Sequence, residues 1–209
     1  MKIWDVSMPI EPKMSVWKGR DSKRPVFTIT RDFVDGVGAR ETNVALDMHT
    51  GTHIDAPLHF VHGGKTMDEI PLTKLLRPVK VLDLTMVQDA IKGEHLEGAL
   101  IEKGDFILLK TRNSLEDILE GEFVYITTEA AERLVELGVE GVGLDALGVE
   151  RDQPDHGTHH ALLGAGIIII EGLCLGEIEA GEYFMIAAPL KVVGLEAAPT
   201  RVFLTELNM

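Results

Sequence analysis

The chain has 209 residues, of which 45% are hydrophobic and 26% charged, and its formal net charge is −14. These values are typical of a soluble globular protein with one sizeable core, and they exclude disordered and collagen-like chains. The acidic balance without clustered Lys and Arg argues against nucleic-acid binding, and no apolar run reaches the roughly 20 residues of a membrane span.

A single cysteine, Cys174, excludes an internal disulfide and fits a reducing compartment. It lies in the apolar segment 172–175, which predicts a small core residue. The first residues carry no apolar stretch of signal-peptide length. We therefore expect a single domain over residues 1–209, located in the cytoplasm.

The first third of the chain predicts strands. Residues 2–6 form a short apolar strand before a proline-rich loop. Trp17 then lies outside any periodic pattern, and an aromatic ring on a loop either caps the core or lines a pocket. The alternating segments 26–33 and 40–48 predict two half-exposed strands, and the turn residues at 35–38 predict that they form a hairpin.

Residues 49–59 carry metal-capable side chains at odd-numbered positions. These are His49, His53, Asp55 and His59. A strand would place them on one face with apolar residues behind. A straight strand would hold the backbones of His49 and His53 about 13 Å apart, too far for one ion. Gly51 therefore predicts a bend that brings the two imidazoles together, in an irregular, ligand-bearing turn.

The rest of the chain mixes strands and helices. Apolar strands are predicted at residues 79–84, 106–110, 141–145, 166–172, 183–188 and 200–205. A helical turn is predicted at residues 72–76, and helices at 94–103, 127–138 and 158–165. A threonine can cap the start of the helix at 127–138, and Gly138 can end it. Thr158 is expected to cap the start of the helix at 158–165. Four isoleucines predict a strand buried on both faces, so Glu171 lies where a central strand leaves the core.

The histidines are clustered in the sequence. Seven of the eight fall in two short windows; the full set is 49, 53, 59, 62, 95, 156, 159 and 160. This clustering predicts a metal site assembled from two separated segments. Imidazoles and carboxylates without thiolates suit a catalytic divalent ion such as Zn²⁺, or Mn²⁺, whereas a structural zinc would more often use cysteines.

Two carboxylates could serve such a site. Asp55 could bridge a pair of ions, or it could instead orient a histidine from behind. Glu171 could bridge from the other side, because an unpaired carboxylate after a buried apolar run would be costly. Two ions held in this way, about 3.5–4 Å apart, activate a water molecule and polarise a carbonyl together.

The run from His49 to His59, with Gly51, Thr52, Asp55 and Pro57 between them, resembles the signature of the metal-dependent cyclase family. That family includes bacterial kynurenine formamidases and isatin hydrolases. The resemblance extends over nearly the whole chain. It includes the proline-rich loop with its tryptophan, the threonine-capped helix followed by Gly-Leu-Asp, and the His-His and Glu-Gly-Leu block at 159–173.

The resemblance implies two ligand sets. His49, His53 and Asp55 resemble the ligands of a first ion, and Asp55, His159 and Glu171 resemble those of a second, with Glu171 touching both. The expected cofactor is two Zn²⁺ ions, with Mn²⁺ as the alternative. The second set uses His159 rather than His160 because the family's ligand pair is separated by twelve residues.

The resemblance also implies roles around the metals. His59 matches the family's proton-transferring histidine, and His160 is expected to be a further catalytic or substrate-contacting group. Trp17 matches an aromatic residue that the formamidases place against the substrate ring. Those enzymes usually have Pro-Gly-Asp after this tryptophan, whereas here Lys-Gly-Arg-Asp follows at 18–21. The departure leaves the metal chemistry untouched and the substrate open.

The fold implied by the resemblance is a single α/β domain with a central mixed, barrel-like β-sheet and flanking helices. The implied activity is metal-dependent hydrolysis of a small aromatic amide, with N-formylkynurenine as the leading substrate. The alternatives are an isatin-like lactam or another small cyclic amide or lactone. Family members form dimers or larger assemblies such as tetramers, so we expect a homo-oligomer in which Trp17 could reach a neighbouring pocket.

Two readings from other classes remain open. A non-catalytic protein could bind a metal or an aromatic ligand with the same residues, but it would be expected to lack the proton-transferring histidine, and His59 is present. A structural zinc in an interaction module predicts a buried, four-coordinate ion with no open position.

Overall fold

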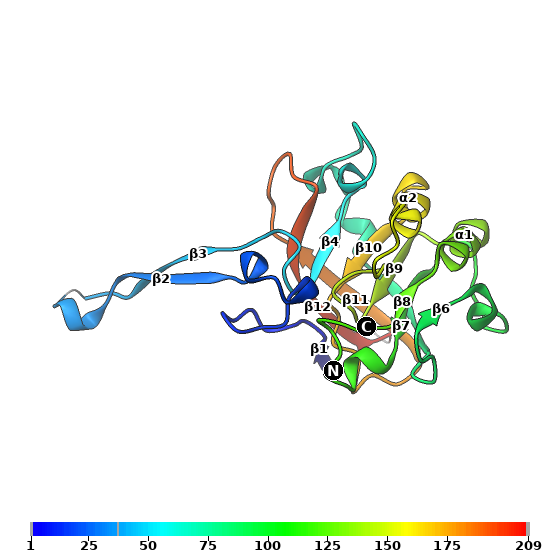
Figure 1. Cartoon of the computed structure of the whole chain (residues 1–209), viewed down its shortest axis with the longest axis horizontal. Helices are drawn as coiled ribbons and strands as arrows, with labels where there is room; N and C mark the ends of the chain where they lie inside the picture. Colours follow the sequence, from blue (N-terminus) through cyan, green and yellow to red (C-terminus); the bar gives the residue numbers. More distant parts are fainter. Residues whose placement is uncertain (1, 37, 208–209) are drawn as a thin grey trace.

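A closed ring of strands forms the centre of the fold (Figure 1). In the computed structural model, which describes residues 2–36 and 38–207, the ring strands in order are β12 (Ala197–Glu206), β11 (Gly181–Pro189), β5 (Leu76–Asp83), β7 (Phe106–Lys110), β9 (Gly141–Leu144), β10 (Ile168–Glu171) and β4 (His53–Asp55). β4 pairs back onto β12 and closes the ring. β1 (Ile3–Asp5) extends the same edge of β12.

The sheet is mixed. β5, β7, β9 and β10 run parallel to one another, and the other pairings are antiparallel. Parallel strands need crossover connections, and here these cover one side of the sheet. The prediction of a mixed, barrel-like sheet with flanking helices is confirmed. A separate small parallel pair, β6 (Ala90–Ile91) and β8 (Tyr125–Ile126), lies near the helices.

Alternate residues of the ring strands face two different cores. In β10, Ile168 and Ile170 belong to the apolar cluster that fills the ring, while Ile169 belongs to the cluster under the helices. The whole strand is buried, as the run of isoleucines predicts. Glu171 is in phase with Ile169, so its carboxylate leaves the strand on the outer face.

Two α-helices, α1 (Thr128–Leu137) and α2 (Gly157–Gly164), lie side by side against the outer face of the parallel strands (Figure 1). α1 has the predicted caps: the Thr127 hydroxyl accepts a hydrogen bond from a first-turn amide, and Gly138 adopts a left-handed conformation. The cap predicted for α2 is wrong. His156 occupies the N-cap position, and the Thr158 hydroxyl instead donates a hydrogen bond to the carbonyl of Ile126 in β8.

The helix predicted at 94–103 is wrong. Only one 3-10 turn forms there, at Gly93–Leu96. Gly98 adopts a positive φ of 80°, which turns the backbone out of the helical path directly after that turn. The chain reaches β7 through irregular backbone instead.

Cys174 is exposed, so its predicted place in the core is also wrong. Its neighbours Leu173 and Leu175 are both buried. Extended backbone points successive side chains in opposite directions, so burying the two leucines turns the thiol between them outward. An apolar sequence context alone did not fix the direction of this side chain.

The predicted hairpin forms an arm that extends away from the ring (Figure 1). Its strands, β2 (Val26–Arg31) and β3 (Glu41–Ala45), are exposed along their whole length, so half-exposure is not observed. The expected turn includes a 3-10 turn at Phe33–Asp35 and a left-handed Gly36, while Val37 lies outside the described residues. Within the described residues, no helix has the length and apolar character needed to cross a membrane.

Candidate metal centre

Segments far apart in the sequence meet on the outer face of the ring, where β4 lies between β10 and β12. The register places His53 opposite Glu171 and Asp55 opposite Ile169. Ile54 packs inside the ring, so the two polar residues of β4 face outward with Glu171. α2 packs against the same face and contributes His159. The predicted convergence of the two histidine segments is therefore observed.

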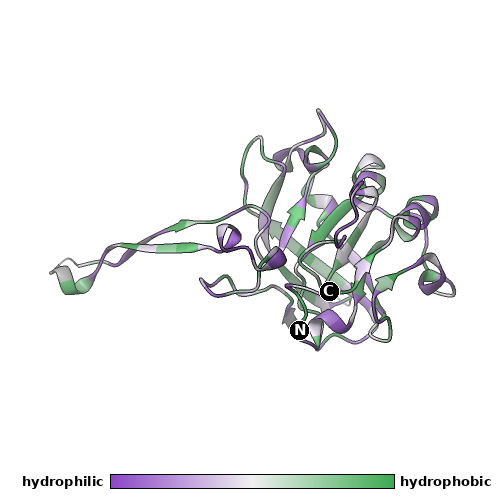
Figure 2. Cartoon of the chain, viewed as in Figure 1, coloured by the Kyte–Doolittle hydropathy of each residue, from purple (hydrophilic) through white to green (hydrophobic). Residues whose placement is uncertain are grey.

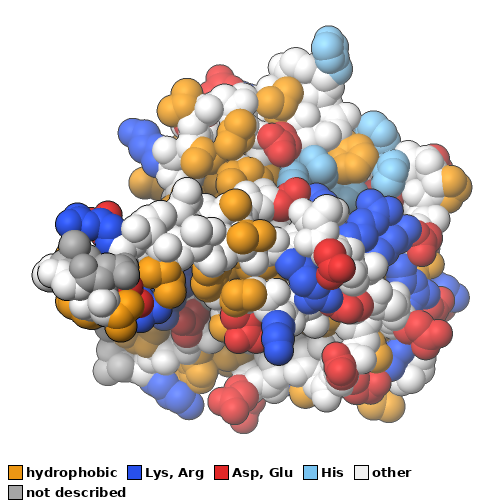
Figure 3. Space-filling model, turned by 60° about the vertical axis from the view of Figure 1, so that its left-hand side comes forward, with side chains coloured by type: hydrophobic (Ala, Val, Ile, Leu, Met, Phe, Trp, Pro, Cys, Tyr) orange, Lys and Arg blue, Asp and Glu red, His pale blue; other side chains and the backbone are white. Residues whose placement is uncertain are grey.

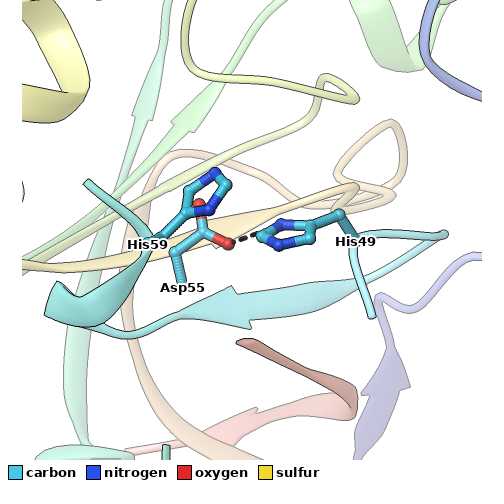
Figure 4. Close-up of side chains that lie close together, drawn as sticks. All are labelled: His49, Asp55 and His59. Atoms are coloured by element: carbon cyan, nitrogen blue, oxygen red, sulfur yellow. Dashed lines mark ion pairs between the residues drawn. The ribbon is translucent and has the colours of Figure 1, made fainter. Parts of the chain in front are cut away.

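The bend predicted at Gly51 is also observed. Gly51 has a φ of 70°, and the loop around it is anchored by the Thr52 hydroxyl, which donates to the carbonyl of Gly172. The bend brings the rings of His49 and His53 to a centroid distance of 5.1 Å. Figure 4 shows His49 approaching Asp55 from this loop, with Nδ1 3.1 Å from Oδ1.

Two carboxylates are shared between two histidines. His53 Nε2 lies 3.4 Å from an Asp55 oxygen and 3.3 Å from a Glu171 oxygen. His159 Nε2 lies 3.7 Å from the other Asp55 oxygen and 3.4 Å from the other Glu171 oxygen. Each carboxylate therefore faces His53 with one oxygen and His159 with the other, an arrangement suited to bridging two ions. The structure brings His49, His53, Asp55, His159 and Glu171 into one cluster.

Buried polar atoms without partners show that this cluster fits a metal. His53 Nε2 and both carboxylate oxygens of Asp55 are inaccessible and have no hydrogen-bond partner among the described residues. Leaving a buried carboxylate unpaired costs free energy. Imidazole nitrogens and carboxylate oxygens are the donors that Zn²⁺ and Mn²⁺ accept. The residues present therefore fit divalent ions.

The electrostatics of the cluster favour bound cations. Burial lowers the pKa of His53, but the neighbouring carboxylates of Asp55 and Glu171 outweigh burial and raise that pKa to about 10. The pKa of His159 rises to about 10 against the same opposing effect of burial. Burial and Asp55 raise the pKa of Glu171, yet the histidines hold it at about 2. The carboxylates stay ionised, and metal ions would replace the imidazole protons, because a ligating imidazole is neutral.

His59 differs from the other histidines of the site. It ends a 3-10 turn, Pro57–His59, that begins two residues after β4. Its ring lies 4.2 Å from that of His49 (Figure 4). Burial lowers the pKa of His59 to about 4 and outweighs the opposing charge of Asp55. This imidazole is therefore neutral at pH 7 and able to accept a proton.

Glu150 belongs to the site although no spacing pattern in the sequence marks it. Its buried Oε1 accepts hydrogen bonds from the backbone N–H and from Nδ1 of His159, at 2.7 and 2.5 Å. The second contact turns Nε2 of that ring toward the shared carboxylates. Asp145, the acidic residue that the sequence places at the end of its strand, instead binds Thr111 and Ser114.

A cavity of about 450 Å³ opens onto the cluster and is lined by His59, His159 and Glu171 among others. Trp17 lines this cavity, which decides between the two places that the sequence left open. His156 also lines it, whereas His160 is exposed and packs its ring against the edge of Phe60. The structure thus brings His160 near the site without placing it on the cavity wall.

Comparisons with known proteins agree with this geometry. The family model described as "Putative cyclase" matches residues 4–151. A kynurenine formamidase from Salinibacter ruber is 35% identical and covers 99% of this chain and 98% of its own. A predicted metal-dependent hydrolase from Bacillus stearothermophilus, 47% identical, superposes with a TM-score of 0.89 over 97% of both chains. Isatin hydrolase A from Labrenzia aggregata, 26% identical, superposes with a TM-score of 0.85 over 98% of this chain and 93% of its own. The chain belongs to the cyclase family.

Proposed function

We propose that this protein is a metal-dependent amide hydrolase that converts N-formylkynurenine to kynurenine and formate. The observation that carries the proposal is the opening of the cluster of shared carboxylates onto a cavity beside a neutral imidazole, His59. The full-length similarity to a kynurenine formamidase supports the choice of substrate. A small aromatic amide fits a cavity of about 450 Å³ with Trp17 and Phe60 in its wall.

Two divalent ions would be held by the clustered side chains of His49, His53, Asp55, His159 and Glu171. We propose that these ions are Zn²⁺, with Mn²⁺ as the alternative. When bound, such ions supply Lewis-acid chemistry, because they lower the pKa of water to around 7 and polarise a carbonyl. His59 takes a proton from the attacking water and returns it to the departing nitrogen. Glu150 holds the His159 ring in its ligating orientation.

The test is formate release from N-formylkynurenine by the purified protein, with elemental analysis of the same preparation. We expect turnover that a chelator abolishes and that Zn²⁺ or Mn²⁺ restores. Absence of turnover in a preparation shown to hold both ions would overturn the proposed substrate.

An isatin-like lactam is the second candidate substrate. The similarity to an isatin hydrolase favours it, and the departure at residues 18–21 from the usual formamidase pattern leaves the choice of substrate open. Hydrolysis of the isatin lactam, followed by absorbance in parallel with the formate-release assay, distinguishes the two candidate substrates. Turnover of either compound excludes a non-catalytic protein that only binds a metal or an aromatic ligand, and it equally excludes a purely structural zinc.

The arm, β2 with β3, supports self-association. Its exposed side chains include Phe27, Ile29 and Phe33, and Figure 2 shows hydrophobic segments along both strands. No other strand of the described residues joins this pair, and a two-stranded ribbon is marginal in water by itself. We therefore propose a homo-oligomer, a dimer or a tetramer, in which the arm packs against a second copy.

Light scattering tests the assembly. The wild type is expected to have the mass of a dimer or tetramer, and the double variant Phe27→Ser with Phe33→Ser a lower mass. A monomeric wild type would contradict this proposal.

We further propose a cytoplasmic role in tryptophan catabolism, which the single cysteine and the proposed substrate support.

A further inference from the structure

The wall of the cavity carries three cationic side chains although the chain as a whole is strongly acidic. Lys18, Arg20 and Lys23 all line it, and all come from the short segment that begins at Trp17. In Figure 3, Lys and Arg side chains lie next to the histidines on this face of the molecule. Three carboxylates, those of Glu150, Asp152 and Glu171, line the same cavity, so the partners of each cation decide whether its charge is free to bind a ligand.

Two of the three cations have partners within the protein. Lys18 forms an ion pair with Asp152, and Lys23 Nζ lies 2.9 Å from a carboxylate oxygen of Asp47. Arg20 differs from them. Within residues 2–36 and 38–207, its side chain forms neither an ion pair nor a hydrogen bond.

The Arg20 guanidinium lies over the ring of Trp17. The guanidinium carbon lies 4.7 Å from the centroid of the indole ring, within the range of a cation–π contact. Both residues line the cavity, and two consecutive 3-10 turns, Trp17–Gly19 and Asp21–Lys23, hold the backbone on either side of the arginine. Stacking occupies the face of a guanidinium and leaves the N–H donors at its edge free.

The carboxylates of the cavity do not neutralise Arg20, because they are engaged elsewhere. Glu150 accepts from His159, and Glu171 lies between His53 and His159. The free fork of donors suits a planar carboxylate, which a guanidinium binds through two parallel hydrogen bonds. We propose that Arg20 binds a carboxylate of the substrate, so that the preferred substrates are aryl formamides carrying a carboxylate group.

This inference rests on the proposed function, and a pair of substrates tests it separately. N-formylkynurenine and its methyl ester share the formamide and the aromatic ring, and they differ only in the carboxylate. We expect the wild type to prefer the acid in kcat/KM by about tenfold, the size of a charge-assisted hydrogen bond at an exposed site. In Arg20→Gln this preference should fall close to one, mainly through KM of the acid. Arg20→Lys keeps the positive charge but loses the paired N–H donors of the guanidinium, so it should retain part of the preference for the acid.

Arg133→Gln is the matched control. Arg133 carries the same charge on α1, pairs with Glu136 and does not line the cavity, so its variant should keep the preference for the acid. A wild type that hydrolyses both compounds equally well, or an Arg20→Gln variant that keeps the wild-type preference, would overturn the assignment of Arg20 while leaving the amide hydrolase standing. Hydrolysis of neither compound would overturn the proposed function, and the assignment with it.

Discussion

His59 lies at the cavity wall, beside the ligand cluster, and its assigned role is proton transfer. We expect His59→Ala to retain bound metal and to lose roughly 10²–10⁴-fold in kcat, the usual contribution of a general acid–base group. Metal content and formate release are measured on the same sample. His62→Ala, an exposed histidine three residues further along, is the control and should behave like the wild type. Loss of metal from His59→Ala would make this residue a ligand instead.

Asp145 makes the stability of the protein depend on pH. Burial raises the pKa of this carboxyl from 3.8 to about 6, although Ser114 and Thr111 donate hydrogen bonds to it. The folded state therefore holds the proton more tightly than the unfolded state. The resulting stability is present below pH 3.8 and is lost as the pH rises through 6, by about 3 kcal/mol.

Asp145→Asn removes this titration. Relative to the wild type, its free energy of unfolding should rise between pH 3.8 and 6, as measured by chemical denaturation at several pH values. Asp83→Asn is the control with the opposite sign, because hydrogen bonds from Thr85 lower the pKa of Asp83. Parallel pH profiles for Asp145→Asn and the wild type would refute this account.

At the scale of residues, the period of two correctly predicted that His53 and Asp55 share a face, because both lie on β4, whereas His49 joins them through the bend at Gly51 and His59 through a 3-10 turn. The choice of His159 over His160 came from the spacing of a known family. Glu150 could not be found in this way. It acts through His159 only because the loop after β9 folds back on α2, and such a contact leaves no mark in local sequence.

At the scale of elements, the junction between β10 and the Gly51 bend depends on one glycine. Gly172 has a φ of +69°, and a Cβ atom there would lie 2.5 Å from the carbonyl oxygen of Gly51. We expect Gly172→Ala to lower the free energy of unfolding by roughly 2–4 kcal/mol, through backbone strain and steric overlap together. It should also weaken metal binding, because the displaced loop carries His49 and leads directly into β4, which begins at His53.

Gly166→Ala is the matched control for that variant. Gly166 has a similar φ of +74°, but a Cβ atom there would meet nothing within 4 Å. Only backbone strain remains, so roughly 1 kcal/mol should be lost and metal affinity kept. Thermal unfolding and metal titration measure both variants. Equal losses in the two would show that the contact with Gly51 is unimportant.

The presence of individual helices and strands was easier to predict than the contacts that surround them. The strands at 106–110 and 141–145 and the helix at 127–138 carry their periods and caps in the sequence, and all three form. Alternation also predicted the hairpin. Alternation could not predict that β2 and β3 extend away from the ring with both faces exposed. An alternating pattern separates the two faces of a strand, but it does not show which other part of the protein packs against each face.

At the scale of the whole molecule, metal removal should loosen the ring. The cluster links β4, β10 and α2, so an ion bound there stabilises the folded state by mass action, by about 2.7 kcal/mol at a hundred times its Kd. A chelator should therefore lower Tm by roughly 5–10 °C, reversibly. In His49→Ala the effect should be smaller. A Tm that the chelator leaves unchanged would count against metal binding.

The closure of the ring also sets the order in which the molecule can be completed. β4 is held along one edge by residues 197–199 of β12, which follow it by more than 140 residues in the sequence. His53 and Asp55 therefore reach their final neighbours only after the ribosome has synthesised residues 197–199. A nascent chain that stops short of this segment leaves one edge of β4 without its partner strand, although all five proposed ligands have already been synthesised.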